Sequence, residues 1–310
     1  MVGASGFVGS AVVDALRSAG HEVVALKAPR LPSAASRESA REFSAPLVAE
    51  LQRAIEGCDA VVNAAGNPDA SLTDEAALAA ANGVLVGLLA TVARMTEGCR
   101  FVHVSSAVVQ GRARVLDDAP AEDGFSAYAR SKVLGEELAL ELGPSETVAY
   151  RPPSVHAPDR RVTRMIARIA RSPLSLVAAP GTQPTPQALI ENVASAIAFL
   201  ATVDQPPPRI VSHPSEDLTT AGLLELLGDR QPRRLPAHLA RMGTGTLAVL
   251  GRFLPPLAAN ARRVEMILFG QEQARSWLSD AGWERPAGVE GWRALAAALQ
   301  TRPEGRGTRT

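Results

Sequence analysis

The chain has 310 residues, of which 46% are hydrophobic and 21% are charged. This length allows one large domain or two smaller ones with full hydrophobic cores, and the composition argues against a disordered chain. The 32 basic and 32 acidic side chains balance, so no overall positive field favours nucleic acid or an anionic membrane as the main partner. Only two cysteines occur, Cys58 and Cys99, without metal-ligand spacing. They predict neither a disulfide framework nor a metal site.

Membrane and secretion signals are not predicted. The best candidate span, residues 247–259, is interrupted by Arg252, Pro255 and Pro256. The amino-terminal residues do not combine a charged segment with a following apolar one. We therefore expect a soluble cytoplasmic protein.

Strand-length apolar runs alternate with helical patterns over the first 150 residues. The predicted strands are 21–26, 59–64, 101–105 and 148–151, and the predicted helices are 10–19, 74–95 and 126–142. This alternation predicts an α/β fold, specifically a Rossmann-type doubly wound parallel sheet covered by helices.

The pattern loosens after Arg151 into proline-rich turns and arginine-rich helical pieces, which predicts a smaller, interleaved C-terminal substrate lobe. The NAD(P)-binding domain is predicted at residues 1–151, with residues 186–201 returning to it. The substrate lobe is predicted at residues 152–185 and 202–301. Residues 302–310 contain no hydrophobic side chain, so we expect a disordered tail.

Three glycines precede the first predicted helix. Gly3, Gly6 and Gly9 form G-x-x-G-x-x-G, which permits a tight turn and a close approach of the backbone to a pyrophosphate. The amides of Phe7 and Val8 would then point at the phosphates. The helix and strand that follow favour a dinucleotide site over an ordinary turn.

Only Met1 and Val2 precede this loop, whereas a strand normally has ~5 residues. We expect that translation starts a few codons upstream or that the protein is compromised in stability. Upstream in-frame codons for an apolar, β-branched run would support the first idea, and an immediate stop codon would exclude it.

A basic residue follows the second predicted strand. Lys27, with Arg30 nearby, suits the 2′-phosphate of NADP, whereas an acidic residue in this place would favour NAD. A solvated surface charge is the alternative interpretation. The sequence thus favours NADP over NAD.

Tyr128 and Lys132 stand four residues apart in a predicted helix and so share one face. The chain contains only two tyrosines and two lysines, which makes a chance Y-x-x-x-K about a 1% event. A lysine cation stabilises a phenolate and draws its pKa of ~10 toward the working range. Lys132 can also bond the hydroxyls of a nicotinamide ribose. A solvated helix face is the alternative.

An apolar segment at residues 101–105 leads into two serines, at the strand end where parallel-sheet enzymes place their chemistry. Ser106 is the predicted hydroxyl that bonds the reacting oxygen, and Ser105 is the alternative. Serines that merely end a strand are the other interpretation.

Together these residues resemble the extended short-chain dehydrogenase/reductase superfamily, in particular the NAD-dependent epimerase/dehydratase family. The matching segments are G-A-S-G-F-V-G, D-A-V-V-N-A-A-G at 59–66, Asn82-Gly83, S-S-A-V-V-Q-G, Y-A-R-S-K, R-P-P-S-V-H-A-P at 151–158 and Gly282-Trp283. They cover most of the chain.

The resemblance implies catalytic roles for Ser106, Tyr128 and Lys132. It also implies that Ala64 and Ala65 line the cofactor and that Asn82 supports the cofactor site. Members commonly dimerise through the helices that correspond to residues 74–95 and 126–142, so the resemblance implies a homodimer.

Departures from the family pattern narrow the reaction. Ala107 and Val108 stand where sugar-nucleotide dehydratases usually carry an Asp-Glu pair, and they cannot supply acid or base for water loss. Ser154 replaces an asparagine often found near a substrate diphosphate, and Gln110 replaces a frequent tyrosine. Dehydration is therefore disfavoured, and the case for a nucleotide sugar is weakened without being excluded.

We therefore expect hydride transfer at a carbinol or ketone carbon of a sugar nucleotide or similar small substrate, with Tyr128 as the acid/base, in an epimerase or a reductase. A hydroxysteroid- or dihydroflavonol-like ketoreductase is the alternative enzyme, and a non-catalytic NAD(P)-sensing module is the alternative outside catalysis. Arg164, Arg168 and Arg171 share a predicted helix face that could meet a diphosphate or simply face solvent. His103 is expected to be a core residue.

Overall fold

The computed structural model describes residues 1–301 except 33–36, 39, 41, 71, 122–123 and 252–263, with backbone only at 247–251. The predicted tail at 302–310 lies outside the described residues, as does part of the apolar stretch at 247–259. The chain forms two compact units. Unit 1 comprises Met1–Pro153, Glu191–Pro214 and Gln273–Arg285, and unit 2 comprises Ser154–Ile190, Ser215–Glu272 and Pro286–Thr310.

These units differ from the predicted domain ranges, beyond a shift of two residues at 152–153, in three places. Residues 202–214 and 273–285, expected in the substrate lobe, belong to unit 1, whereas residues 186–190 belong to unit 2. The reason is strand pairing over long sequence distances. Residues Ile210–Ser212 add a strand to the sheet of unit 1, while Gln187–Leu189 pair with Ser154–His156 in unit 2.

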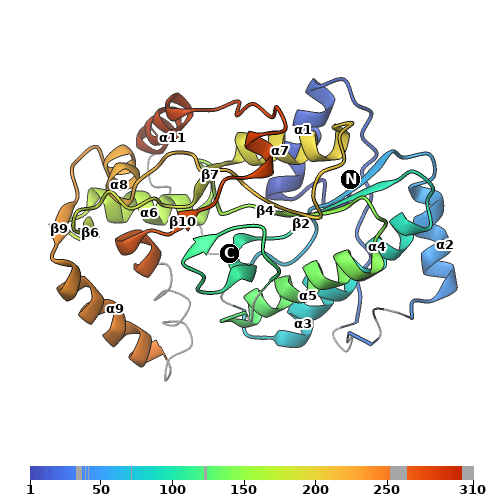
Figure 1. Cartoon of the computed structure of the whole chain (residues 1–310), viewed down its shortest axis with the longest axis horizontal. Coiled ribbons are helices and arrows are strands. Elements are labelled where there is room, and N and C mark those ends of the chain that lie inside the picture. Colours follow the sequence, from blue (N-terminus) through green and yellow to red (C-terminus); the bar gives the residue numbers. More distant parts are fainter. Residues whose placement is uncertain are drawn as a thin grey trace. The chain divides into compact units, whose positions relative to one another are not determined.

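The sheet of unit 1 is parallel and has the strand order β1-β2-β4-β8. Its strands are β1 (Ala60–Asn63), β2 (Arg100–Val104), β4 (Thr147–Arg151) and β8 (Ile210–Ser212). Every residue of β2 and β4 is buried, as expected for central parallel strands that are covered on both faces. Figure 1 shows α1 (Phe7–Ser18) and α7 (Ile190–Thr202) on one side of this sheet and α4 (Leu85–Arg94) and α5 (Ala127–Leu142) on the other.

A single residue extends the sheet beyond β1. Val2 forms isolated parallel bridges with Leu26 and with Asn63. The Val2 N–H donates to the Val62 carbonyl at 2.8 Å, and the Leu26 N–H donates to the Met1 carbonyl at 2.8 Å. The predicted strand at 21–26 is therefore wrong in extent: only Leu26 is bridged, because the segment beside it pairs through Met1 and Val2 alone.

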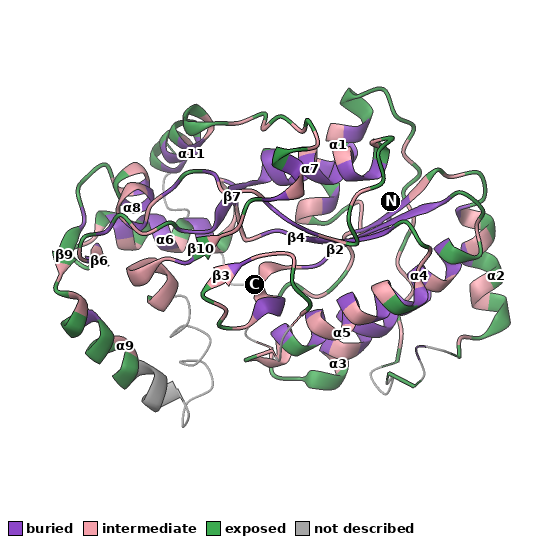
Figure 2. Ribbon diagram, in the orientation of Figure 1, coloured by how far each residue is buried: buried purple, intermediate pink, exposed green. Residues whose placement is uncertain are grey.

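The predicted helix at 74–95 consists of three continuous pieces, α3 (Glu75–Ala79), a π-helical turn (Ala80–Val84) and α4. Asp74 caps its start by accepting the Ala77 N–H at 2.9 Å. With α2 (Ala45–Ala54), α5 and the buried strands (Figure 2), it forms the main core of unit 1.

This same segment, Glu75–Arg94, is long and apolar enough to cross a membrane by length and composition, and 72% of its 18-residue apolar window is buried inside the structure. A core helix has the same composition, and Leu85, Leu88 and Leu89 lie in the main core.

Unit 2 contains two short parallel strand pairs, β5 (Ser154–His156) with β7 (Gln187–Leu189) and β6 (Leu176–Ala178) with β9 (Arg233–Leu235). Its described helices include α6 (Arg161–Arg171), α8 (Thr220–Gly228), α9 (Ala237–Gly251) and α11 (Val289–Thr301). Arg171 donates to the carbonyls of Leu227 and Leu299, each at 3.3 Å, near the ends of α8 and α11. Of the predicted arginine face, Arg171 is therefore committed to holding helix ends, while Arg164 is exposed.

Candidate active site

The glycine loop fits closely against the end of β1. Gly3 has φ +80°, and a Cβ there would lie 2.6 Å from the Ala65 nitrogen. The Gly6 N–H donates to the Gly3 carbonyl at 2.9 Å, and a Cβ on Gly9 would lie 1.9 Å from that same oxygen. Neither position can hold a side chain without moving the backbone.

This loop leads directly into α1, and the start of the helix has no side-chain cap among the described residues. The N-cap residue is Gly6. The amino end of a helix carries partial positive charge and directs N–H groups outward. The amides of Phe7 and Val8 lie in this first turn, so the loop and helix fit the pyrophosphate of a dinucleotide.

The chain after β1 is held by asparagines. The Ala65 N–H donates to Asn63 Oδ1 at 3.0 Å, and the Ala64 N–H donates to the Val2 carbonyl at 3.0 Å. The backbone of Ala64 and Ala65 thus borders the glycine loop, where a lining role was predicted.

Asn82 lies in the π-helical turn and is buried. Its Oδ1 accepts the Asn67 N–H at 2.7 Å, and its Nδ2 donates to the Asn67 carbonyl and to Ser131 Oγ at 3.1 and 3.0 Å. The side chain therefore ties the segment after β1 to α5. This geometry favours a positioning role for Asn82 over direct contact with a cofactor.

Lys132 and the carboxyl end of β2 meet directly. Lys132 Nζ donates to the Val104 carbonyl at 3.1 Å in a buried environment. Burial lowers the pKa of this ammonium to about 8, against the opposing effect of the nearby Glu136 carboxylate. The Lys132 ammonium therefore releases its proton more readily than an exposed lysine does, and it lies near the end of β2.

The two serines after β2 differ in their surroundings. Ser105 is buried, and its Oγ donates to Glu136 Oε2 at 2.7 Å. Ser106 is partly exposed and caps the 3-10 turn at Ala107–Gln110, its Oγ accepting the Val108 N–H at 3.3 Å. Because Ser105 is committed to an internal bond, the geometry favours Ser106 as the available hydroxyl.

Tyr128 lies one helical turn before Lys132 and is partly exposed. Ser126 starts α5 by accepting the Ala129 N–H at 3.1 Å, which fixes where this face of the helix begins. The helix packs against the 3-10 turn that Ser106 caps. The other tyrosine, Tyr150, is fully buried, with its hydroxyl 2.6 Å from His213 Nδ1.

Three histidines are buried among the described residues, and two of them, His103 and His156, have lowered pKa values. His103 is fully buried, as predicted, and burial together with the Lys132 charge holds its pKa well below the usual range. His156, in unit 2, lies 2.7 Å from Gln187 Oε1 through Nε2 and 3.0 Å from Thr163 Oγ1 through Nδ1. Burial lowers its pKa to about 4, so both imidazoles are neutral and serve packing.

Lys27 is exposed and directly follows Leu26, the residue bridged to Val2. It therefore lies at the same edge of the sheet as the glycine loop, where a cofactor ribose was predicted. Among the described residues, no group of three or more His, Cys, Asp or Glu side chains could hold a metal ion.

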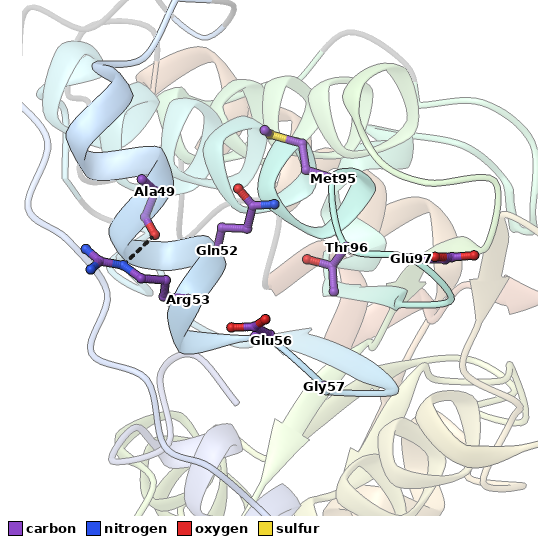
Figure 3. A pocket seen from close by; sticks show the side chains of 8 residues that line it. All are labelled: Ala49, Gln52, Arg53, Glu56, Gly57, Met95, Thr96 and Glu97. Carbon is purple, nitrogen blue, oxygen red and sulfur yellow. Dashed lines mark hydrogen bonds between the residues drawn. The ribbon is translucent and has the colours of Figure 1, made fainter.

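A surface cavity of about 470 Å³ lies elsewhere in unit 1 (Figure 3). Its lining residues are Ala49, Gln52, Arg53, Glu56, Gly57, Met95, Thr96 and Glu97. Gly57 precedes β1 and Glu97 precedes β2, so the cavity lies at the amino ends of these strands. Parallel α/β sheets bind their ligands at the carboxyl ends, where the glycine loop and Lys132 lie. This cavity is therefore not the candidate site.

Sequence reasoning missed two charged residues at the site. Glu136 and Arg151 form an ion pair in which both side chains are buried. A signal was present, since Tyr128, Lys132 and Glu136 recur every four residues on one helix face and Arg151 ends a buried strand.

Residues 1–212 match the NAD dependent epimerase/dehydratase family. The chain belongs to this family. The predicted family is thereby confirmed, and the predicted α/β fold with a parallel sheet agrees with the structure. A search of curated proteins found no significant match.

Several solved structures share the fold. MoeE5 in complex with UDP-glucose and NAD is 20% identical, with a TM-score of 0.63 over 96% of this chain and 97% of that chain. The human epimerase family protein SDR39U1 (isoform 2) with NADPH is 19% identical, with a TM-score of 0.65 over 97% and 98%. The UDP-glucuronic acid 4-epimerase from Bacillus cereus with NAD is 17% identical, with a TM-score of 0.61 over 96% and 97%. At these identities, the similarities show a common fold.

Proposed function

We propose that this family member is an NAD(P)-dependent epimerase or reductase that acts at a carbinol or ketone carbon of a sugar nucleotide or similar small substrate. The observation that carries the proposal is the bond from Lys132 Nζ to the Val104 carbonyl. It joins the helix face of Tyr128 and Lys132 to the strand end that leads into Ser106. The proposed acid Tyr128, the cation Lys132 and the hydroxyl of Ser106 thus belong to one region of unit 1.

In this proposal, residues at the carboxyl edge of the sheet would hold the cofactor. Gly3, Gly6 and Gly9 let the backbone approach its pyrophosphate, and the amides of Phe7 and Val8 bond the phosphate oxygens. The backbone of Ala64 and Ala65 lines the site, while Asn82 holds that segment in place. Lys132 would bond the ribose hydroxyls, and a nicotinamide held there would supply or accept the hydride.

We propose NADP as the preferred cofactor, because the exposed cation of Lys27 lies at the edge where a 2′-phosphate would be accommodated. The similar structures hold NAD in two cases and NADPH in the third. A nicotinamide dinucleotide is thus supported by family membership, and the choice between the two rests on Lys27.

Tyr128 is the proposed acid/base. When the substrate carbinol is oxidised, the phenolate accepts the hydroxyl proton as the hydride leaves the carbon, and the reverse step returns the proton to the carbonyl oxygen. The Lys132 cation stabilises the phenolate. Ser106 Oγ already accepts the Val108 N–H, so its own hydrogen can be donated to the reacting oxygen.

Dehydration remains disfavoured in this proposal, because Ala107 and Val108 cannot transfer protons. Gln110 is buried and pairs twice with Asp117, through its Nε2 at 2.5 Å and its Oε1 at 3.0 Å. It therefore has a structural use, and we assign it no part in the chemistry.

We also propose a homodimer. Every residue from Asn82 to Ala90 is already buried within one chain, so a partner would meet α5 and the start of α3. Light scattering of the purified protein tests this: a mass near 32.4 kDa would contradict it.

The function is tested first by denaturing the purified protein and measuring released NAD(H) and NADP(H) by mass spectrometry. Retained NAD would favour an epimerase that returns the hydride to the same molecule and would overturn the Lys27 argument. An empty protein that binds NADPH reversibly would favour a ketoreductase.

Turnover is then assayed with UDP-glucose and UDP-glucuronic acid plus NAD, and by NADPH consumption with ketone substrates. Tyr128→Phe is expected to lower turnover about 10²-fold or more, while the matched variant Tyr150→Phe retains it. Unchanged turnover in Tyr128→Phe would overturn the mechanism. Cofactor binding without turnover on any of these probes would favour the sensing module.

A further inference from the structure

A buried ion pair lies one helical turn beyond Lys132 on α5. The Arg151 side chain is 0% exposed and that of Glu136 is 1% exposed. Arg151 donates Nε to Glu136 Oε2 at 3.0 Å and Nη2 to Glu136 Oε1. This two-bond arrangement uses the planar fork of the guanidinium and fixes the orientation of both side chains.

The remaining bonds of the pair reach two other segments. Arg151 Nη1 donates to the carbonyls of Asp117 and Ala119 at 3.1 and 2.6 Å. Glu136 Oε2 also accepts the Ser105 hydroxyl at 2.7 Å. The pair therefore joins the end of β4, the middle of α5, the end of β2 and the loop that precedes α5.

Stability alone does not explain this arrangement. Removing two charges from water is expensive, and a buried ion pair is commonly replaceable by apolar side chains without loss of stability. What apolar side chains cannot reproduce is the directed set of bonds, which sets α5 at one position relative to the end of β2.

We propose that Glu136 and Arg151 are positioning residues that hold Tyr128 and Lys132 against the Ser106 end of β2 and maintain the charge of Lys132. The inference rests on the proposed function, because it assigns these two residues to the same reaction. Neither is proposed to contact the substrate.

The titratable groups next to Lys132 determine how readily it keeps its charge. His103 on β2 is neutral because burial and the Lys132 charge hold its pKa well below the usual range. Glu136, one turn along α5, supplies the negative charge that favours the Lys132 cation. Loss of that charge would lower the Lys132 pKa further and weaken the stabilisation of a Tyr128 phenolate.

Tyrosine content makes this measurable without a substrate. The chain has two tyrosines, so the near-ultraviolet absorbance of tyrosinate reports two titrations, and Tyr128→Phe identifies which belongs to Tyr128. The Lys132 cation is lost above about pH 8, so it stabilises a Tyr128 phenolate that forms below that value. In Glu136→Gln we expect the midpoint of this Tyr128 titration to rise by roughly one pH unit. We also expect kcat to fall roughly 10-fold to 100-fold with little change in KM. An unchanged Tyr128 midpoint in folded Glu136→Gln would overturn the proposal.

A second variant guards against misfolding, because Glu136→Gln leaves Arg151 buried without a charged partner. The double variant Glu136→Gln/Arg151→Met removes both charges, and we expect it to fold with a raised Tyr128 midpoint and a reduced kcat. If it keeps the wild-type midpoint and kcat, the pair is only structural and the proposal is wrong.

The same unit offers a matched control. Arg100 donates to Glu146 Oε2 through Nε at 3.0 Å and through Nη2 at 2.9 Å, at the amino ends of the strands. We expect Arg100→Met/Glu146→Gln to leave the Tyr128 midpoint and kcat unchanged. An equal shift in this control would show a nonspecific effect and overturn the proposal.

The two proposals fail in different ways. Full turnover in Tyr128→Phe would overturn the proposed function, and the inference with it. An inactive Tyr128→Phe together with unaffected Glu136 variants would leave the function standing and remove only the positioning role.

Discussion

Two regions of unit 1 prepare the proposed site by different means. We call residues Ser105, Ser106, Tyr128, Lys132 and Glu136 the catalytic corner, and residues 2–9 with Leu26 and Lys27 the cofactor edge. In the corner, buried side chains are bonded to defined partners, as Lys132 is to the Val104 carbonyl and Ser105 to Glu136. At the edge, Val2 contributes two isolated bridges, and the fit of Gly3 and Gly9 depends on missing side chains.

This contrast between bonded side chains and close backbone contacts indicates which kind of substitution each region tolerates. The corner depends on charge and hydrogen bonding in a place with little water, where an unpaired group is expensive. The edge depends on space for the backbone, so an added methyl group should do more harm there than a changed charge. The following variants break or sharpen this contrast, from the largest expected effect to the smallest.

The strongest test of the corner is Lys132→Met. We expect turnover to fall about 10²-fold or more, because the phenolate loses its cation. We also expect the free energy of unfolding, measured in urea at pH 7, to rise by about 1 kcal/mol. Burying the Lys132 ammonium costs about 3 kcal/mol, and removing this cost outweighs the loss of the bond to the Val104 carbonyl, which contributes about 1–2 kcal/mol. Arg130→Met, an exposed cation on the same helix, is the control that retains turnover. Lower stability in Lys132→Met would contradict the assigned cost of burial.

The strongest test of the edge is Gly9→Ala. Its Cβ would lie 1.9 Å from the Gly3 carbonyl, so the loop must shift and move the Phe7 and Val8 amides. We expect NADPH affinity, measured by fluorescence titration, to fall roughly 10-fold to 100-fold. Gly243→Ala is the matched control, since nothing lies within 4 Å of a Cβ there. Unchanged affinity in Gly9→Ala would exclude this loop as the pyrophosphate site.

The pH dependence of turnover separates the regions further. The Lys132 pKa is about 8 in the folded protein, against 10.5 for an unperturbed lysine, so the cation is present below pH 8 and is lost above it. We expect turnover to fall roughly tenfold for each pH unit above that value. Between these two pKa values the unfolded chain binds more protons, so the contribution of Lys132 to stability rises with pH as activity falls. A flat activity profile to pH 10 would contradict the role of Lys132.

The smallest effect is expected from an exposed charge at the edge. Lys27→Asp should lower the ratio of NADPH to NADH affinity several-fold, and added salt should reduce the difference because the side chain is exposed. Arg17→Asp, in the last turn of α1, is the matched charge change. If Lys27→Asp leaves the ratio unchanged, the preference for NADP has another origin or does not exist.

Most of the elements of unit 1 could be predicted because their residues follow local rules. The periodicity of residues 126–142 and the apolar run at 101–105 predicted α5 and β2 closely. The strand at 21–26 was over-extended, because Leu26 alone in this segment forms a bridge, to Val2. The lobe boundaries failed for a similar reason, since residues 210–212 belong to whichever strand they pair with, and that strand is about sixty residues distant in the chain.

The sequence by itself determined the family, the α/β fold and the spacing of Tyr128 and Lys132, because motifs and helical periodicity are local properties of a chain. Only the tertiary structure decided that Ser105 is engaged while Ser106 is partly exposed, that Arg171 holds helix ends, and that Arg151 meets Glu136. These contacts depend on which side chains become buried next to one another when the chain folds. A buried charge needs a partner, and the fold can supply it from a distant part of the chain, so no local sequence pattern identifies that partner.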